Sequence, residues 1–148
     1  MTQVTILSID TNNNIHNVIF DRSNFYPGGG GQPCDTGRLE SKSFNGDVID
    51  VFEKNNNIIH KVKPISGHIK IGDKLNLLLD QEKRDRIVRM HTGEHILFQA
   101  LERVIEEVHL VKIDLNAQES SLFINTKELS WNQLFKVEKI VNDIISKD

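Results

Sequence analysis

The sequence predicts an α+β protein in which an all-β segment, residues 1–80, precedes the first part of a mixed segment, residues 81–148. Three observations lead to this prediction. Short apolar and β-branched runs alternate with turn-rich clusters over the first segment. At Asp80 the apolar period changes from that of strands to that of a helix. Two further strand-like runs and a second helical pattern then follow.

The expected strands of the first segment are separated by turns rich in Asn, Asp and Gly. They cover residues 4–7, 16–20, 47–52, 58–62 and 74–79. The run Asn55-Asn56-Asn57 is expected to join two of them in a hairpin. Several short strands at this spacing are typical of a small barrel or a sandwich.

The second segment begins with a long helix, predicted from about Gln81 to Glu107. Asp80 is a suitable N-cap, and Glu82 in the first turn is favourable at the positive end of a helix. Strand character returns over residues 111–115 and 121–124.

A second, amphipathic helix is predicted after Ser130. Ser130 and Gln133 have the spacing of a capping box, and apolar residues then recur at helical intervals. Trp131, directly after the cap, is interpreted as a packing residue.

Composition and charge restrict the class of protein. Apolar residues make up 38% and charged residues 26% of the 148 residues, as in ordinary globular domains. No run approaches the ~18 consecutive apolar residues of a membrane span, so no membrane partner is expected. The single cysteine, Cys34, excludes an internal disulfide framework and favours a cytoplasmic protein.

The net charge of −3 conceals a basic middle segment. Residues 61–89 carry eight Lys and Arg against four Asp and Glu. Such a cluster can contact a phosphate backbone locally, although a solvated surface is the simpler interpretation.

A glycine-rich run, Phe25-Tyr26-Pro27-Gly28-Gly29-Gly30-Gly31-Gln32-Pro33, is the first segment that indicates chemistry. Consecutive glycines cost backbone entropy, but they let main-chain N–H groups approach a ligand in dihedrals closed to other residues. The run is neither a P-loop nor a dinucleotide fingerprint. Gln32 adds a side-chain amide. A flexible surface turn is the alternative.

The second such segment is His91-Thr92-Gly93-Glu94-His95. Histidines at i and i+4 lie on one helical face, so both imidazoles can reach one metal ion. Thr92 stands where the zincin motif has Glu, and Glu94 is expected to point away from the pair. Two partly buried histidines hydrogen-bonded in the core are the alternative. The remaining histidines are interpreted as structural or solvent-exposed, and Cys34 as a loop residue.

Together these segments resemble the editing domain of alanyl-tRNA synthetase and its free-standing AlaX-type relatives. The stretch from Phe25 to Gly37 is similar to the glycine-rich motif of that family, and His91 to Leu97 to its first metal half-site. Residues 130–145 are similar to the helix before its closing strands. The resemblance implies a translation-factor-like β-barrel over residues 1–80, followed by the start of an α+β editing domain.

The resemblance also implies a reaction: hydrolysis of the ester that joins serine or glycine to alanine-specific tRNA. A zinc ion held by His91 and His95 would position or activate the attacking water. Gly29, Gly30, Gly31 and Gln32 would orient the aminoacyl group and the terminal adenosine. The candidate catalytic residues are therefore His91, His95 and Gln32.

Further candidate contacts follow from the same resemblance. The hydroxyl of Ser23 or Thr92 would contact a serine side chain. Phosphates of the mischarged tRNA would be contacted by the basic residues Lys83, Arg84, Arg86 and Arg89.

The zinc site is incomplete in this sequence. The family carries a Cys-x-x-x-His downstream of the position of Asn142, and here only Asp143 to Asp148 follow. Two imidazoles fall short of the three protein ligands usual at catalytic zinc. We therefore interpret the chain as a fragment of a longer protein. In the fragment, water, a buffer anion or a neighbouring molecule would complete the coordination of the metal ion.

Other interpretations remain open. The chain could be a degenerate relative, a metal-free tRNA-binding or assembly module, or an editing domain of the threonyl-tRNA synthetase type. The oligomeric state does not follow from the sequence.

Overall fold

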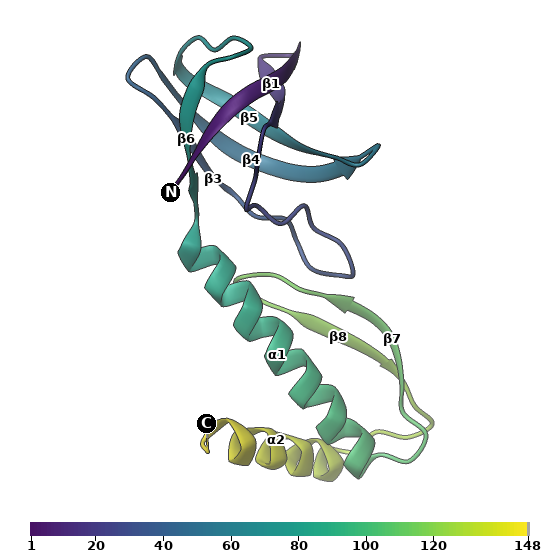
Figure 1. Cartoon of the computed structure of the whole chain (residues 1–148). Coiled ribbons are helices and arrows are strands. Elements are labelled where there is room, and N and C mark those ends of the chain that lie inside the picture. The colour runs from purple at the N-terminus through teal and green to yellow at the C-terminus, as the bar shows by residue number, and fades with distance from the viewer. Residues whose placement is uncertain (148) are drawn as a thin grey trace. The chain divides into compact units, whose positions relative to one another are not determined.

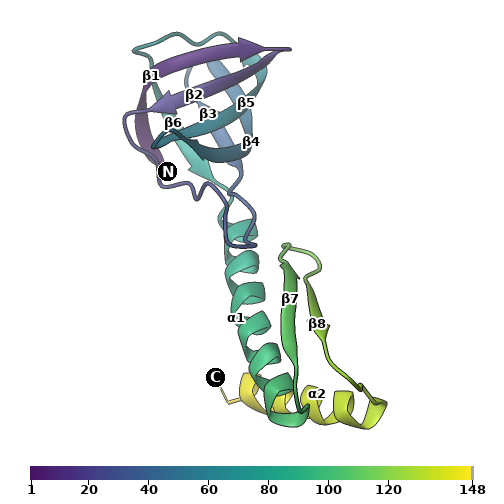
Figure 2. The same ribbon diagram turned by 90° about the vertical axis from the view of Figure 1, so that its right-hand side faces the viewer.

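The computed structural model describes residues 1–147 and divides the chain into two compact units, the first being Met1–Arg84 and the second beginning at Asp85. The first unit is a closed barrel with the strand order β1-β2-β5-β4-β3-β6 (Figures 1 and 2). The strands are β1 (Thr2–Asn12), β2 (Ile15–Phe20), β3 (Gly37–Glu40), β4 (Phe44–Lys54), β5 (Asn57–Gly67) and β6 (Lys74–Leu79). The predicted N-terminal barrel is confirmed.

Strand β3 closes the barrel by pairing antiparallel with both β4 and β6, and it is not among the strands expected from the sequence. Its four residues include only one buried apolar side chain, Leu39. Gly37 allows β3 to lie directly against β6, because a Cβ there would come within 2.0 Å of the Leu78 carbonyl oxygen. A strand defined by close backbone approach has no apolar pattern to reveal it.

The barrel is filled by apolar side chains that alternate with outward-facing residues along each strand. The hydrophobic core consists of Val4, Ile6, Val18, Phe20, Phe25, Leu39, Phe44, Val48, Val51, Val62, Leu75 and Leu77.

An ion pair between Asp35 and Arg84 holds both ends of the glycine-rich segment. The Asp35 side chain is 5% exposed and accepts hydrogen bonds from Arg84 and, at 2.5 Å, from the Tyr26 N–H. Arg84 Nη2 also donates to the Asn24 carbonyl at 2.7 Å. These contacts join the chain entering the segment to the chain leaving it.

Helix α1 (Gln81–Val104) begins directly after Asp80, as predicted, and ends three residues before the expected Glu107. The Asp80 carboxylate accepts the N–H of Lys83 at 3.0 Å, and its own N–H donates to the Thr36 carbonyl at 2.9 Å. The cap therefore fixes the first turn of α1, including Arg84, to the strand that follows the glycine-rich segment.

In the second unit, β7 (His109–Asp114) and β8 (Ser121–Asn125) form an antiparallel hairpin that runs beside α1 (Figures 1 and 2). Helix α2 (Trp131–Ile145) starts with the predicted capping box, in which Ser130 and Gln133 bond reciprocally. The core of this unit consists of Ala100, Leu101, Ile105, Val108 and Val137. No helix within residues 1–147 is long and apolar enough to cross a membrane.

The packing role expected for Trp131 is wrong, because its side chain is 77% exposed. It lies at the open edge of an apolar hollow of about 540 Å³ beside Leu134 and Phe135.

Substituting Arg84 by Ala is expected to destabilise the barrel by about 3 kcal/mol, because the largely buried Asp35 carboxylate would lose its charged partner. Hydrogen exchange of the barrel amides measures this free energy for the first unit separately. Arg38→Ala is the matched control, since Arg38 lies 3.8 Å from Asp47 in a solvent-exposed pair and should change stability by less than about 1 kcal/mol. Equal effects of the two substitutions would contradict the role assigned to Arg84.

Candidate metal centre and glycine-rich loop

The glycine-rich segment forms a tight turn with defined geometry. Gly29 and Gln32 exchange two backbone hydrogen bonds of 3.0 Å, which leaves Gly30 and Gly31 at the tip. Their φ angles are 60° and 85°, in the left-handed region that residues with a Cβ adopt at a cost. Tyr26 Oη donates to the Gly29 carbonyl at 3.1 Å and supports the turn from one side.

The tip of this turn presents unused hydrogen-bonding groups. Gly29, Gly30 and Gly31 are exposed, and Gln32 is half-buried. Within residues 1–147 no hydrogen bond involves the N–H of Gly30 or Gly31, or the side-chain amide of Gln32. The turn therefore offers backbone and side-chain donors to a ligand, as its sequence predicts.

His91 and His95 lie on one face of α1 with their rings turned toward each other. Their Nε2 atoms are 3.2 Å apart, and the ring centroids are separated by 4.8 Å. Two nitrogens that each bind one tetrahedral zinc ion at about 2.0–2.1 Å lie roughly 3.3–3.4 Å apart. The His95 side chain is 65% exposed. The Nε2 separation thus suits a metal half-site. His91 is half-buried, and His95 is more exposed than the alternative of two partly buried core histidines requires.

The sequence predicted that Glu94 points away from the histidine pair, and this prediction is wrong. Its side chain is 5% exposed, and Oε2 lies 3.6 Å from Nδ1 of His95. Each of His91, Glu94 and His95 offers one possible ligand atom, and the three atoms lie within 4.8 Å of one another. Glu94 stands three residues after His91, which places it on nearly the same helical face. The H-x-x-E-H spacing was the signal that could have revealed it.

The environment of Glu94 fits a cation. Oε2 is buried and has no hydrogen-bond partner among the described residues. A buried carboxylate oxygen without a donor is costly, and a nearby positive charge or ring N–H offsets that cost. The cluster can therefore hold a metal ion.

Ser23 and Thr92, the two candidate hydroxyls, each bond within their own unit. Ser23 Oγ lies 2.8 Å from Nε2 of His60 and accepts the N–H of Phe25 at 3.1 Å. Thr92 Oγ1 donates back to the Val88 carbonyl at 3.2 Å, as hydroxyls inside helices often do.

His60 is fully buried in the barrel. Its ring packs against Phe20, with the centroids 4.8 Å apart. Burial lowers the pKa of His60 to about 4, because the charged ring would lose its solvation. His60 is therefore a neutral core residue that holds Ser23 at the start of the glycine-rich segment.

The basic residues at the start of α1 have different surroundings. Lys83 Nζ donates to the Cys34 carbonyl at 3.4 Å, and Arg84 is bound to Asp35. Arg86 and Arg89 are exposed on α1. Two of the four cations thus support the glycine-rich segment, whereas the other two lie at the surface.

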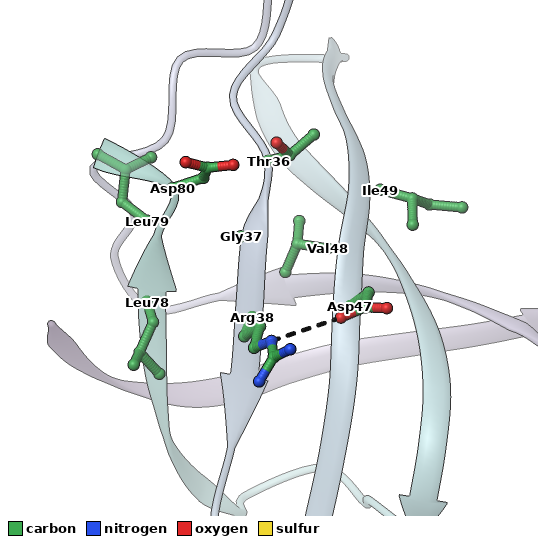
Figure 3. Close-up of a pocket in the computed structure, with 9 residues that line it drawn as sticks. All are labelled: Thr36, Gly37, Arg38, Asp47, Val48, Ile49, Leu78, Leu79 and Asp80. Carbon is green, nitrogen blue, oxygen red and sulfur yellow. Dashed lines mark ion pairs between the residues drawn. The ribbon is translucent and has the colours of Figure 1, made fainter. Parts of the chain in front are cut away.

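A hollow of about 560 Å³ on the outside of the barrel, over β3, β4 and β6, includes none of the predicted site residues. Figure 3 shows Arg38 at this hollow directed toward Asp47, so its charge is already paired. Cys34, a half-buried loop residue, donates to Asp50 at 3.4 Å, and burial raises the pKa of its thiol. Neither feature indicates a reactive group.

A closed barrel with a glycine turn, followed by a helix with a histidine pair, is the arrangement that the resemblance to aminoacyl-tRNA editing domains implied. Residues 3–83 match the family model described as tRNA synthetases class II (A), and the chain belongs to this family. The barrel and the glycine-rich turn lie within the matched residues.

Relatives identify the branch of the family. The chain is 36% identical over 132 residues to the alanyl-tRNA editing protein AlaX-L of Pyrococcus horikoshii, covering 88% of this chain and 32% of that protein. It is 36% identical over 128 residues to the alanine–tRNA ligase of Carboxydothermus hydrogenoformans, covering 84% and 14%. It is 30% identical over 137 residues to AlaX-M of Methanosarcina acetivorans, covering 88% and 56%.

These matches confirm the resemblance to alanyl-tRNA editing domains. At the level of the family, the chain is related to alanyl-tRNA editing and to alanine–tRNA ligase. It spans between 14% and 56% of the length of the three relatives.

The stability of the barrel is expected to fall as the pH decreases from about 6.5 to about 4. The folded-state pKa of His60, about 4, lies below the ordinary value of 6.5. The unfolded chain therefore binds more protons in this range, and stability rises with pH by about 3 kcal/mol in total. Barrel amide exchange across this range should show a flatter pH dependence in His60→Gln. His68→Gln, at an exposed position of the same unit, should keep the wild-type slope; a wild-type slope in His60→Gln would contradict the assignment.

Proposed function

We propose that this chain acts in an aminoacyl-tRNA editing hydrolase that cleaves the ester joining serine or glycine to alanine-specific tRNA. The observation that carries the proposal is the convergence of the Nε2 atoms of His91 and His95, 3.2 Å apart, beside the buried carboxylate of Glu94. Relatives at 36% and 30% identity are named alanyl-tRNA editing proteins, which favours the alanyl over the threonyl type.

The proposed metal is zinc, because neutral imidazoles are among its preferred ligands and a site with open positions suits hydrolysis. His91 and His95 would hold it through Nε2. When bound, zinc supplies a Lewis acid that activates water and polarises the ester carbonyl. The remaining coordination positions are proposed to be filled by water or by groups from a longer parent protein, since the relatives extend well beyond the matched region.

The glycine-rich turn is proposed to bind the aminoacyl end of the substrate. The N–H groups of Gly30 and Gly31 have no protein partner within residues 1–147 and are held in a fixed turn, so they can donate to a carbonyl or developing oxyanion. Gln32 would orient the terminal adenosine or the aminoacyl group through its amide.

The two hydroxyl groups are given different roles. Thr92 is exposed, and its oxygen can still accept a hydrogen bond from a serine side chain. Ser23 is held by His60 and by the N–H of Phe25, so its proposed role is to support the turn.

Phosphate contacts are proposed for the basic start of α1. Arg86 and Arg89 are exposed there, and Lys83 is half-buried. Arg84 would not contact phosphate directly. Its proposed role is to hold the glycine-rich turn through Asp35 and Asn24. We propose a cytoplasmic location, because the proposed substrate is a tRNA. The same exposed cations favour, as a second candidate function, a tRNA-binding module that acts without metal.

Hydrolysis of serine-mischarged alanine tRNA by this chain is the experiment that tests the proposed function. Release of serine should require zinc and should fall more than about 100-fold in His91→Ala and His95→Ala, because losing a ligand costs more than losing an outer hydrogen bond. Zinc content is measured on the same samples by atomic absorption.

His109→Ala is the matched control, since His109 is an exposed histidine of the same unit. It should retain both zinc and activity. Retention of tRNA binding with neither zinc nor serine release would instead establish the metal-free binding module.

Charge reversal at Arg89 is expected to weaken tRNA binding and to reduce the slope of log affinity against log salt by about 1, because one phosphate contact is lost. Filter binding at several salt concentrations measures both quantities. Lys136→Glu, an exposed cation of α2, is the control that should leave the slope unchanged. An unchanged slope in Arg89→Glu would remove Arg89 from the proposed tRNA surface.

A further inference from the structure

Glu94 is unusual among the charged residues of α1. Its side chain is 5% exposed, whereas the adjacent His95 side chain is 65% exposed. It borders a hollow of about 340 Å³ that is lined by apolar residues, including Met90, Leu97 and Leu122, and also by Arg89, Ser120 and Ser121. Apolar surroundings make a lone carboxylate costly, so its placement requires a specific partner.

The partner that the geometry provides is the Nδ1 atom of His95. Oε2 of Glu94 lies 3.6 Å from Nδ1 and has no hydrogen-bond partner among the described residues. Contacts of this kind are often long in an empty site and shorten when the ligand binds.

The two nitrogens of His95 therefore face different groups. Nδ1 faces the carboxylate of Glu94, and Nε2 faces Nε2 of His91 at 3.2 Å. A neutral imidazole carries one proton. If that proton is on Nδ1, it is donated to the carboxylate and the lone pair of Nε2 is free for a metal ion.

We propose that Glu94 is a positioning residue that holds the His95 ring in the Nδ1–H tautomer and directs its Nε2 toward the metal. This inference rests on the proposed function, because it assigns a role within the same metal site. It concerns a residue for which neither the sequence pattern of the two histidines nor the names of the relatives give any role.

The order H-x-x-E-H also occurs in metallohydrolases, and the glutamate of the related zincin motif is the general base. The geometry here favours a different role. Oε2 of Glu94 lies 3.6 Å from Nδ1 of His95, whereas the nitrogen of His95 that meets His91 is Nε2, at 3.2 Å. A carboxylate that contacts Nδ1 is placed to orient the ring, which favours a positioning role.

The test compares zinc affinity in wild type, Glu94→Leu and Glu94→Gln by competition with a chromophoric chelator. Leu fills the apolar hollow without an acceptor, and Gln restores an uncharged acceptor. Affinity should fall about 10- to 100-fold in Glu94→Leu and recover in part in Glu94→Gln. Glu102→Leu, at an exposed position of the same helix, is the matched control and should bind zinc as wild type does.

Two spectroscopic measurements separate positioning from other roles. The absorption bands of the cobalt-substituted protein should keep their positions in Glu94→Leu, because the ligand set is unchanged. In the zinc-free wild type, long-range ¹H–¹⁵N spectra should show His95 as the Nδ1–H tautomer, and Glu94→Leu should lose this preference.

The outcomes that overturn the inference differ from those that overturn the proposed function. Wild-type zinc binding that all Glu94 variants retain, or a wild-type His95 in the Nε2–H tautomer, overturns the positioning role alone. Shifted cobalt bands in Glu94→Leu would make Glu94 a ligand, and unchanged zinc affinity with lost hydrolysis would make it a base; either result rejects positioning. A wild-type chain that binds no zinc removes the proposed metal site, and the inference with it. If Glu94→Leu does not fold, the tautomer of His95 in the wild type and the zinc affinity of Glu94→Gln still test the positioning role.

Discussion

The ion pair between Asp35 and Arg84 is the interaction on which the glycine-rich turn depends. Glycine loses more conformational entropy on ordering than any other residue, so four in succession would not hold a defined turn by themselves. The Asp35 carboxylate accepts hydrogen bonds from the N–H of Tyr26 and the guanidinium of Arg84. Arg84 also donates to the carbonyl of Asn24. One buried carboxylate thereby links the two ends of the glycine-rich segment to each other and to the first turn of α1.

The same arrangement explains why a basic residue near a proposed nucleic-acid surface need not contact phosphate. In the sequence Arg84 belongs to a cluster of cations and looks equivalent to its neighbours. In the structure its side chain is 28% exposed and satisfies a buried carboxylate, whereas Arg89 is exposed. Charge clusters in a sequence do not distinguish these roles, because pairing across 49 residues is invisible to local patterns.

The sequence predicted the elements that have an apolar periodicity or a helix-capping residue. It did not predict features that depend on contacts between residues far apart in the chain. Asp80 and Ser130 mark helix starts because capping is local chemistry, and both act as expected. Strand β3 was missed, since Gly37 is there for close approach to β6 and carries no apolar signal. The two histidines followed from helical spacing, but Glu94 borders a hollow that also includes residues of β7 and β8, which local spacing does not show.

The two candidate sites use different parts of the chain, and this determines how each tolerates change. The glycine turn offers main-chain N–H groups whose positions are set by φ angles of 60° and 85°, so any side chain at Gly30 or Gly31 alters the geometry itself. The candidate metal centre instead depends on side chains projected from a regular helix, where the backbone accepts most residues and the chemistry depends on which side chains are present. The glycine turn is therefore constrained by conformation and the histidine cluster by chemistry. A sequence shows the second constraint directly, since ligand residues can be read by type and spacing, and shows the first only as an excess of glycine.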